Sequence, residues 1–211
     1  MIIRKTIFTL MLLFISSVAL ADLRIASFNI QHLGWDNGKN FTALARVVSQ
    51  YDFVAIQELM NQEGIDRLKS ELENKTGESW STIYSHRIGR STYQEKYAFL
   101  WRDSQVDYLD GAVVYLDDRD IFAREPFSAR FRSASGIEFA IGNIHVLYGN
   151  SMSDREPEIN ALASYWQWMS DTYGGDSNLM LAGDFNLRPG HGAFNALKQH
   201  AKPCLLYTSP S

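Results

Sequence analysis

Short apolar runs that end in polar residues are the feature of this chain that most constrains its fold. Residues 53–58 read Phe-Val-Ala-Ile-Gln-Glu, and residues 178–186 run from Asn-Leu-Met-Leu-Ala into Gly-Asp-Phe-Asn. A short apolar run that is closed by a turn residue indicates a buried β-strand. Glu58 and Asp184 are therefore expected at the carboxyl ends of two buried strands, where the sheet opens to solvent.

Two more apolar runs end in the same way. Residues 140–145 finish in His145, and residues 23–30 carry Asn29 near their end. Carboxylate and amide oxygens are ligands that Mg²⁺ prefers, and a bound metal ion assists phosphodiester hydrolysis. Together with an imidazole at a strand end, these groups are the ingredients of a Mg²⁺-assisted phosphodiester hydrolase.

The order of the remaining elements indicates an α/β layered protein. Residues 23–30, 40–50 and 53–58 read as strand, helix and strand, a β-α-β opening. Helical spacing recurs at 63–75 and at 154–173. Further strands are predicted at 81–87, 95–102, 106–116, 127–132, 138–147 and 178–184. No repeat, linker or low-complexity tract interrupts this pattern, which favours one domain over residues 22–203.

The first residues have the composition of a secretory signal. Arg4 and Lys5 precede an apolar stretch over residues 6–20, followed by Ala-Leu-Ala at 19–21. We therefore predict a signal peptide over residues 1–21, secretion to the periplasm or medium, and no stable membrane association. A membrane anchor is the alternative, but the run is shorter than the roughly 20 residues that span a bilayer.

The last eight residues, Cys-Leu-Leu-Tyr-Thr-Ser-Pro-Ser at 204–211, look like a translated sequencing adapter. Our hypothesis is that this tail is not native and that the protein continues differently after about Pro203. Cys204 is the only cysteine of the chain. The native portion would then have no disulfide, so burial must stabilise it.

The charge balance is acidic, with a formal net charge of −4. An acidic protein gains little long-range attraction to a polyanion. If the substrate is a nucleic acid, bound cations and local arginines have to offset the repulsion. This argues mildly against a tight nucleic-acid binder and does not argue against a hydrolase.

Four motifs together carry a family resemblance. They are Ser-Phe-Asn-Ile at 27–30, Ile-Gln-Glu at 56–58, Asn-Ile-His at 143–145 and Gly-Asp-Phe-Asn at 183–186. In this order and spacing the chain resembles the endonuclease/exonuclease/phosphatase superfamily. The block at 88–100 and Arg-Glu-Pro at 124–126 are similar to the narrower deoxyribonuclease I family. The resemblance covers residues 23 to about 189 and implies a four-layer α/β sandwich, two packed mixed sheets flanked by helices.

The resemblance also implies a metal site and a water-activating site. Asn29 and Glu58 would bind Mg²⁺, which Mn²⁺ can replace, and Ca²⁺ is a further candidate ion. Asp184 and Asn186 would orient and help to activate the attacking water, and a metal ion shared with them is left open. Strand-like alternation around Phe185 would point both side chains to one face.

The resemblance assigns proton transfer to His145, with Glu95 behind it to orient and charge the imidazole. Tyr93, two residues earlier on the same strand face, would donate to a phosphate oxygen. Arg90 and Arg124 are candidate phosphate contacts. A satisfied core histidine and solvated arginines are the alternatives, and the pair could line a solvent-facing cleft or be a buried salt link. The histidines outside any motif are expected to be structural: His32, His86, His191 and His200.

The sequence departs from the family pattern in two places. No counterpart of the family's final Asp-His pair follows Pro189, so the fold would be incomplete at the C-terminus. We expect this chain to be poorly folded and inactive, with exposed sheet edges that promote aggregation, and the complete gene product to be active. Gln31 and Met60 also stand where vertebrate members carry minor-groove arginines, which should weaken the grip on the DNA backbone.

Three functions remain open from the sequence. The first is a secreted, monomeric, Mg²⁺-dependent endonuclease that cuts DNA. The second is a secreted phosphodiesterase of lipid head groups or small phosphate esters, like a sphingomyelinase, which would want an exposed aromatic hairpin that we do not find. The third is a non-catalytic scaffold of the same fold, which the full set of candidate site residues argues against.

Overall fold

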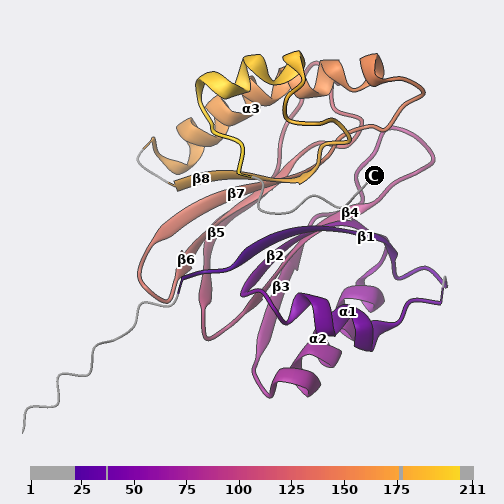
Figure 1. Ribbon diagram of the computed structural model, residues 1–211, viewed down its shortest axis with the longest axis vertical. Coiled ribbons are helices and arrows are strands. Elements are labelled where there is room, and N and C mark those ends of the chain that lie inside the picture. The colour runs from indigo at the N-terminus through magenta and orange to yellow at the C-terminus, as the bar shows by residue number, and fades with distance from the viewer. Residues whose placement is uncertain (1–21, 37, 176–177, 205–211) are drawn as a thin grey trace, which may run out of the picture.

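Two mixed four-stranded β-sheets pack face to face at the centre of the molecule, with helices on their outer faces (Figure 1). This computed structural model describes residues 22–36, 38–175 and 178–204. The expected α/β sandwich with two mixed sheets and flanking helices is confirmed. The signal peptide predicted at 1–21 and most of the tail, 205–211, lie outside the described residues. No helix of the described ranges is both long and apolar enough to cross a membrane.

The first sheet has the strand order β1-β2-β4-β3. Strands β1 and β2 are parallel, whereas β4 is antiparallel to both of its neighbours. Helices α1 and α2 cover the outer face of this sheet (Figure 1). The bounds are β1 (Ile25–Leu33), α1 (Phe41–Val48), β2 (Phe53–Leu59), α2 (Gln62–Thr76), β3 (Trp80–Tyr84) and β4 (Lys96–Arg102).

The second sheet has the strand order β5-β6-β7-β8, with β7 and β8 parallel and the other pairs antiparallel. Helix α3 covers its outer face (Figure 1). Three short 3₁₀ helices that the sequence did not predict lie near α3. The bounds are β5 (Val106–Val114), β6 (Phe127–Ser133), β7 (Glu138–His145), η1 (Met152–Asp154), α3 (Glu156–Tyr173), β8 (Asn178–Asp184), η2 (Gly192–Asn195) and η3 (Leu197–Gln199).

Local sequence fixes where the first two helices begin and where the second one ends. Asn40 and Asn61 cap α1 and α2, each accepting a backbone hydrogen bond of 2.9 Å from the residue three positions later. Such caps typically contribute about 1 kcal/mol each. Gly77 ends α2 with φ +69°, a left-handed conformation that suits glycine at a helix C-terminus.

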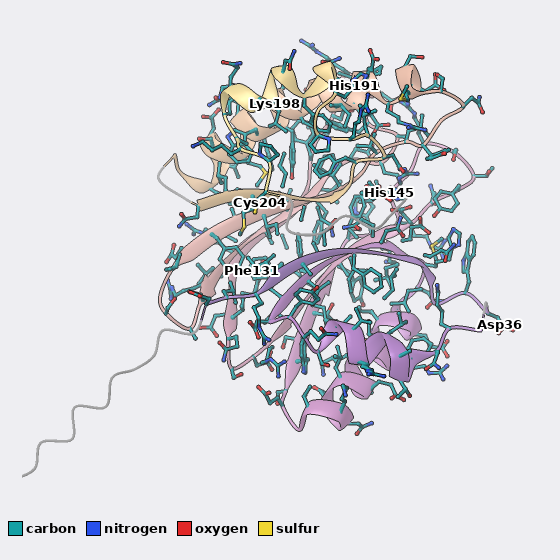
Figure 2. The ribbon with its side chains drawn as sticks, in the orientation of Figure 1. Asp36, Phe131, His145, His191, Lys198 and Cys204 are labelled. Carbon is teal, nitrogen blue, oxygen red and sulfur yellow. The ribbon has the colours of Figure 1, made fainter. Side chains whose placement is uncertain are left out.

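Aromatic side chains fill the space between the two sheets. Phe53 of β2 meets Phe131 of β6 edge to face, with ring centroids 4.8 Å apart, and Phe99 of β4 lies 5.5 Å from the same ring. All three rings are buried, and each contributes about 1.5–3 kcal/mol of transfer free energy. Figure 2 labels Phe131 in this core and His145 toward the opposite end of the sandwich.

The predicted elements are all present, with shifts at their ends. Strand β1 continues past the predicted end to Leu33 because the chain forms a bulge and then pairs Leu33 with Leu59. Strand β4 starts at Lys96, one residue after Glu95. Tyr93 therefore lies in the preceding loop and not on the strand, so its predicted strand-face alternation with Glu95 is wrong.

Candidate active site

The topology brings the candidate residues to one edge of the sandwich. Parallel strands end at the same edge, so Asn29 of β1 and Glu58 of β2 lie together, and His145 and Asp184 are direct partners at the ends of β7 and β8. Because β4 runs antiparallel to β2, its start, next to Glu95, lies at this edge too. The sequence prediction that these strand ends converge is correct.

One amide group joins the carboxylates of the two sheets. Asn29 donates from Nδ2 to Glu58 Oε1 at 2.8 Å and to Asp184 Oδ2 at 3.1 Å. Glu58 belongs to the first sheet and Asp184 to the second, so this contact spans both. Two carboxylates held so close repel each other, and a cation between or beside them would relieve the repulsion.

The donors present fit a Mg²⁺ ion. Within the described ranges, no three His, Cys, Asp or Glu side chains converge as a metal cluster. Mg²⁺ does not need such a cluster, because it keeps several waters and binds through one or two carboxylates. Glu58 offers the hard carboxylate oxygen that this ion takes, and Asp184 lies beside it. Asn29 turns its Nδ2 toward both carboxylates, and its Oδ1 accepts from the Gln31 N–H at 3.0 Å, so the amide would have to turn to present its oxygen to the ion.

The imidazole of His145 is held by the carboxylate of Glu95. His145 Nδ1 lies 2.9 and 3.1 Å from the two Glu95 oxygens, and His145 Nε2 lies 4.0 Å from Glu58 Oε1. An ionised carboxylate accepts only, so Nδ1 carries a proton and Nε2 faces Glu58. Glu95 is 0% exposed and His145 7%, so of the two arrangements left open, the pair is buried and does not line an open cleft.

Arg124 supports this pair from behind. Its Nε and Nη2 donate to the His145 carbonyl at 3.1 and 3.0 Å, and Nε lies 3.7 Å from Glu95 Oε2. Burial disfavours the charged guanidinium, but the carboxylates of Glu95 and Glu158 outweigh that effect and raise the pKa of Arg124. The buried guanidinium is thus already committed to protein partners.

The backbone of His145 has a second buried partner. Its N–H donates to the Tyr97 hydroxyl at 2.9 Å. Burial, assisted by the charge of Glu95, raises the pKa of Tyr97 well above its ordinary value, so the phenol stays neutral. Tyr97 is fully buried, and its hydroxyl also fixes the position of the histidine.

Tyr93 and Arg90 lie in the loop before β4. Partial burial and the charges of Glu95 and Glu58 raise the pKa of Tyr93, so its hydroxyl remains a hydrogen-bond donor. Arg90 donates to the Asp120 carbonyl, and 44% of its side chain is exposed. Of the two candidate phosphate contacts, Arg90 is therefore the more accessible and Arg124 the more buried.

Asn186 reaches the site through a turn and not through strand alternation, so the predicted alternation around Phe185 is wrong. Strand β8 ends at Asp184, and Asn186 has φ +49°. The turn is closed by Asn186 N donating to Asp184 Oδ1 at 3.0 Å. The amide side chain donates to the Val146 carbonyl at 2.8 Å.

Backbone strain gathers around these residues. Five non-glycine residues of the described part of the chain have a positive φ, and four of them border the site: Gln31, His32, Glu58 and Asn186. Each such conformation costs on the order of 1–3 kcal/mol and persists only where surrounding contacts enforce it. Strain of this kind concentrates at functional sites, which supports the assignment of this edge.

Two buried amides that sequence reasoning left without a role join the sheets beneath the site. Gln57 donates from Nε2 to Asn143 Oδ1 at 2.7 Å, and Asn143 donates to the Ile56 carbonyl at 2.9 Å. The hint in the sequence that these amides belong to the site is their position, because Gln57 precedes Glu58 and Asn143 is two residues before His145. The pair fixes the distance between these two catalytic candidates.

His32 also has a partner at the site, although it was expected to be merely structural. Its Nε2 lies 3.2 Å from Glu58 Oε2, and its backbone N–H donates to the same oxygen at 3.1 Å. The only signal in the sequence is its position three residues after Asn29.

Comparison with known proteins identifies the same family as the sequence motifs. A family model described as the endonuclease/exonuclease/phosphatase family matches residues 26–208. A deoxyribonuclease of Thioalkalivibrio sp. (strain K90mix) is 49% identical over 207 residues, covering 96% of this chain and 57% of the relative. Human deoxyribonuclease-1 is 32% identical over 178 residues, covering 78% of this chain and 61% of the relative. The chain thus spans about three fifths of the length of these relatives.

Solved structures agree on the fold. A family protein from Bacteroides thetaiotaomicron has a TM-score of 0.65 at 19% identity, covering 84% of this chain and 68% of that one. The human Nocturnin catalytic domain has a TM-score of 0.60 at 16% identity, covering 84% and 70%. The sequence motifs, the sandwich and these matches lead to one assignment: the chain belongs to the endonuclease/exonuclease/phosphatase family.

Proposed function

We propose that this protein is a secreted, metal-dependent endonuclease that hydrolyses phosphodiester bonds of DNA as a monomer. The observation that carries the proposal is the convergence of a buried Glu95–His145 pair with the carboxylates of Glu58 and Asp184 at one edge. The names of the relatives, deoxyribonuclease and deoxyribonuclease-1, support DNA as the substrate.

In this proposal, Glu58 and Asn29 would hold Mg²⁺ or Mn²⁺. The bound ion would supply Lewis-acid stabilisation of the charge that develops on the phosphate oxygens. Glu95 holds a proton on His145 Nδ1, so Nε2 is the atom that gives or takes a proton at the phosphate or leaving oxygen. The chain's own contribution is this fixed tautomer and orientation.

The remaining residues would position substrate and water. Asp184 and Asn186 share a turn, and their oxygens would orient the attacking water. Tyr93, kept protonated, would donate to a phosphate oxygen, and the exposed Arg90 would pair with another. Arg124 would act mainly by keeping positive charge behind His145. These roles need groups within hydrogen-bond reach of one phosphate, and a phosphate bound at the common edge would meet that need.

The proposal also includes export of the protein and a complete gene product that is longer than this chain. The leader at 1–21 would direct the protein out of the cytoplasm and be removed. Because the relatives are longer than this chain, we expect residues 22–203 alone to be inactive and prone to aggregate, and the complete gene product to cut DNA. Wild-type-like nicking by purified residues 22–203 would contradict this part.

The test is cleavage of supercoiled plasmid by the full-length protein. We expect nicking with Mg²⁺ or Mn²⁺, loss of nicking in excess EDTA, and recovery when the metal is restored. Glu58→Gln should lower the rate by roughly 10² or more, the scale expected for a lost charge-stabilising group. Glu63→Gln, in the exposed first turn of α2, is the matched control and should cut normally.

Other outcomes would select the competing functions. Undiminished cleavage in EDTA would remove the metal mechanism. Release of phosphocholine from sphingomyelin vesicles without DNA cleavage would identify a lipid phosphodiesterase. A folded protein that acts on neither substrate would be the non-catalytic scaffold.

A further inference from the structure

A stacked aromatic pair lies beside Glu58 and has no part in the mechanism above. The indole of Trp35 packs on the imidazole of His32, with ring centroids 4.3 Å apart and planes at 19°. Tyr93 meets Trp35 edge-on at 6.4 Å. Trp35 is nevertheless 48% exposed, so part of its surface is open to solvent. Through His32, this ring is connected to the proposed metal ligand.

The loop that carries Trp35 is held firmly against the start of α2. Asn61 donates from Nδ2 to the Gly34 carbonyl at 2.6 Å, and Met60 N donates to the Leu33 carbonyl at 2.8 Å. Gly34 has φ +101°, and a Cβ there would lie 2.2 Å from the Asn61 side chain, so only glycine fits. The indole is therefore presented on a fixed backbone and does not fold back onto the core.

The loop that carries Trp35 lies on the same side of the molecule as the candidate site (Figure 2). Figure 2 labels Asp36, the residue after Trp35, at the tip of its loop on the same side of the molecule as His145. A single exposed aromatic needs no explanation, but a pre-positioned ring stacked beside catalytic candidates indicates a contact with substrate.

The neighbouring side chains indicate which substrate the ring contacts. Gln31 is neutral, and Met60 is buried, so neither can grip a duplex backbone as an arginine would. The chain is also acidic overall. Stacking on an aromatic ring needs no positive charge and tolerates any base, but it requires a base whose face is open. Unpaired bases offer such a face, whereas bases inside a duplex do not.

We propose that Trp35, backed by His32, is a stacking subsite for an unpaired nucleobase next to the cleaved phosphate. It makes single-stranded or frayed DNA a better ligand than intact duplex. The inference rests on the proposed nuclease function for its biological meaning, but the binding preference can be measured without any cleavage.

The experiment compares binding of a 15-nucleotide oligodeoxythymidylate and of a duplex of equal length to the full-length protein in EDTA at low salt. Trp35→Ala should weaken single-strand binding roughly tenfold, within the range of one lost stacking contact, and duplex binding less than twofold. Trp35→Phe should recover most of the affinity. Tyr108→Ala, which removes another exposed aromatic from β5, is the control and should change neither.

Tryptophan fluorescence shows which ligand occupies the proposed stacking subsite. Part of the intrinsic tryptophan emission should be quenched by the oligonucleotide in the wild type and not in Trp35→Phe. Equal loss of single-strand and duplex affinity in Trp35→Ala, or no loss, would overturn the inference. A response of Trp35 to phosphocholine vesicles but not to the oligonucleotide would also overturn it, in favour of a lipid contact. Failure of DNA cleavage with this binding preference intact would refute the proposed function alone.

Discussion

Replacing Glu95 with Gln removes one negative charge and keeps the shape of a fully buried side chain. The two Glu95 oxygens lie 2.9 and 3.1 Å from His145 Nδ1, and the amide of Gln can still accept one of these bonds. Arg124, with Nε 3.7 Å from Glu95, would lose its nearest carboxylate. The substitution therefore tests the charge behind the imidazole while leaving the packing in place.

The expected rates follow from the shared role of the two residues. His145→Ala removes the proton-transfer group and should slow cleavage by roughly 10² or more, the usual contribution of a positioned acid or base. Glu95→Gln should have an effect of similar size, because the imidazole loses its orientation and its stabilised charge. If the two act as one unit, the double variant loses little beyond the worse single one. Independent roles would multiply the losses to roughly 10⁴.

The burial of the pair adds an effect on stability. A pair in an open cleft would leave the melting temperature almost unchanged, but Glu95 and His145 are both buried. Removing one partner of a buried ion pair typically costs about 3–5 kcal/mol. For a domain of this size, a cost of 3 kcal/mol lowers the melting temperature by about 6–12 °C. We therefore expect activity and stability to fall together.

The assay measures initial nicking rates and thermal unfolding of the full-length protein and of the three variants. Rates are taken well below the lowest melting temperature, so that unfolding cannot imitate a catalytic loss. His191→Ala is the control, because His191 also faces a carboxylate, Glu156 at 3.8 Å, but outside the site. Near-normal cleavage by folded His145→Ala protein would end the assignment of the site, and a 10⁴-fold loss in the double variant would refute the coupling.

Three further outcomes are expected. Burial works to raise the pKa of Asp52, but hydrogen bonds from Arg24 and the charges of Arg24 and Arg102 hold that pKa below its ordinary value. Asp52→Asn should cost about 2 kcal/mol in urea unfolding at pH 7. Because the folded pKa lies below the unfolded value of about 3.9, this cost should shrink only as pH falls through that range. Arg124→Lys, which loses the paired donation to the His145 carbonyl, should slow nicking about tenfold with a smaller change in KM. A reductant should leave nicking by the complete protein unchanged, since residues 22–203 contain no cysteine; marked inactivation would count against a foreign tail.

The sequence predicted the elements, and the strand ends that carry the candidate site residues, because both depend on short-range pattern. A buried strand is visible as an apolar run, so Glu58, His145 and Asp184 could each be placed at a strand end from the order of the residues alone. That the two sheets bring these ends together was implied only by the family resemblance. The same periodicity indicated which segments form helices and which form strands.

The turns, and the contacts that hold the candidate site residues in position, could not be predicted in this way. Tyr93 and Asn186 were assigned to strand alternation, but each lies in a turn whose shape depends on local hydrogen bonds such as Asn186 N to Asp184 Oδ1. Arg124 was expected at the phosphate, yet its guanidinium donates to the His145 carbonyl, a partner 21 residues away. Contacts of this kind depend on the packing of two sheets and leave no periodic signal in either segment.

The buried hydrogen bond between Gln57 and Asn143, here called the amide bridge, joins the two sheets that together carry the candidate site. Glu58 and Asn29 belong to the first sheet and His145 and Asp184 to the second, so any sliding of one sheet over the other would separate the proposed metal ligands from the proposed proton-transfer group. Aromatic packing alone resists sliding weakly, because apolar contacts are not directional. The hydrogen bond of 2.7 Å from Gln57 to Asn143 is directional and buried, and breaking it removes the partner of the buried Asn143 Oδ1. The bridge therefore sets the register between the two halves of the site.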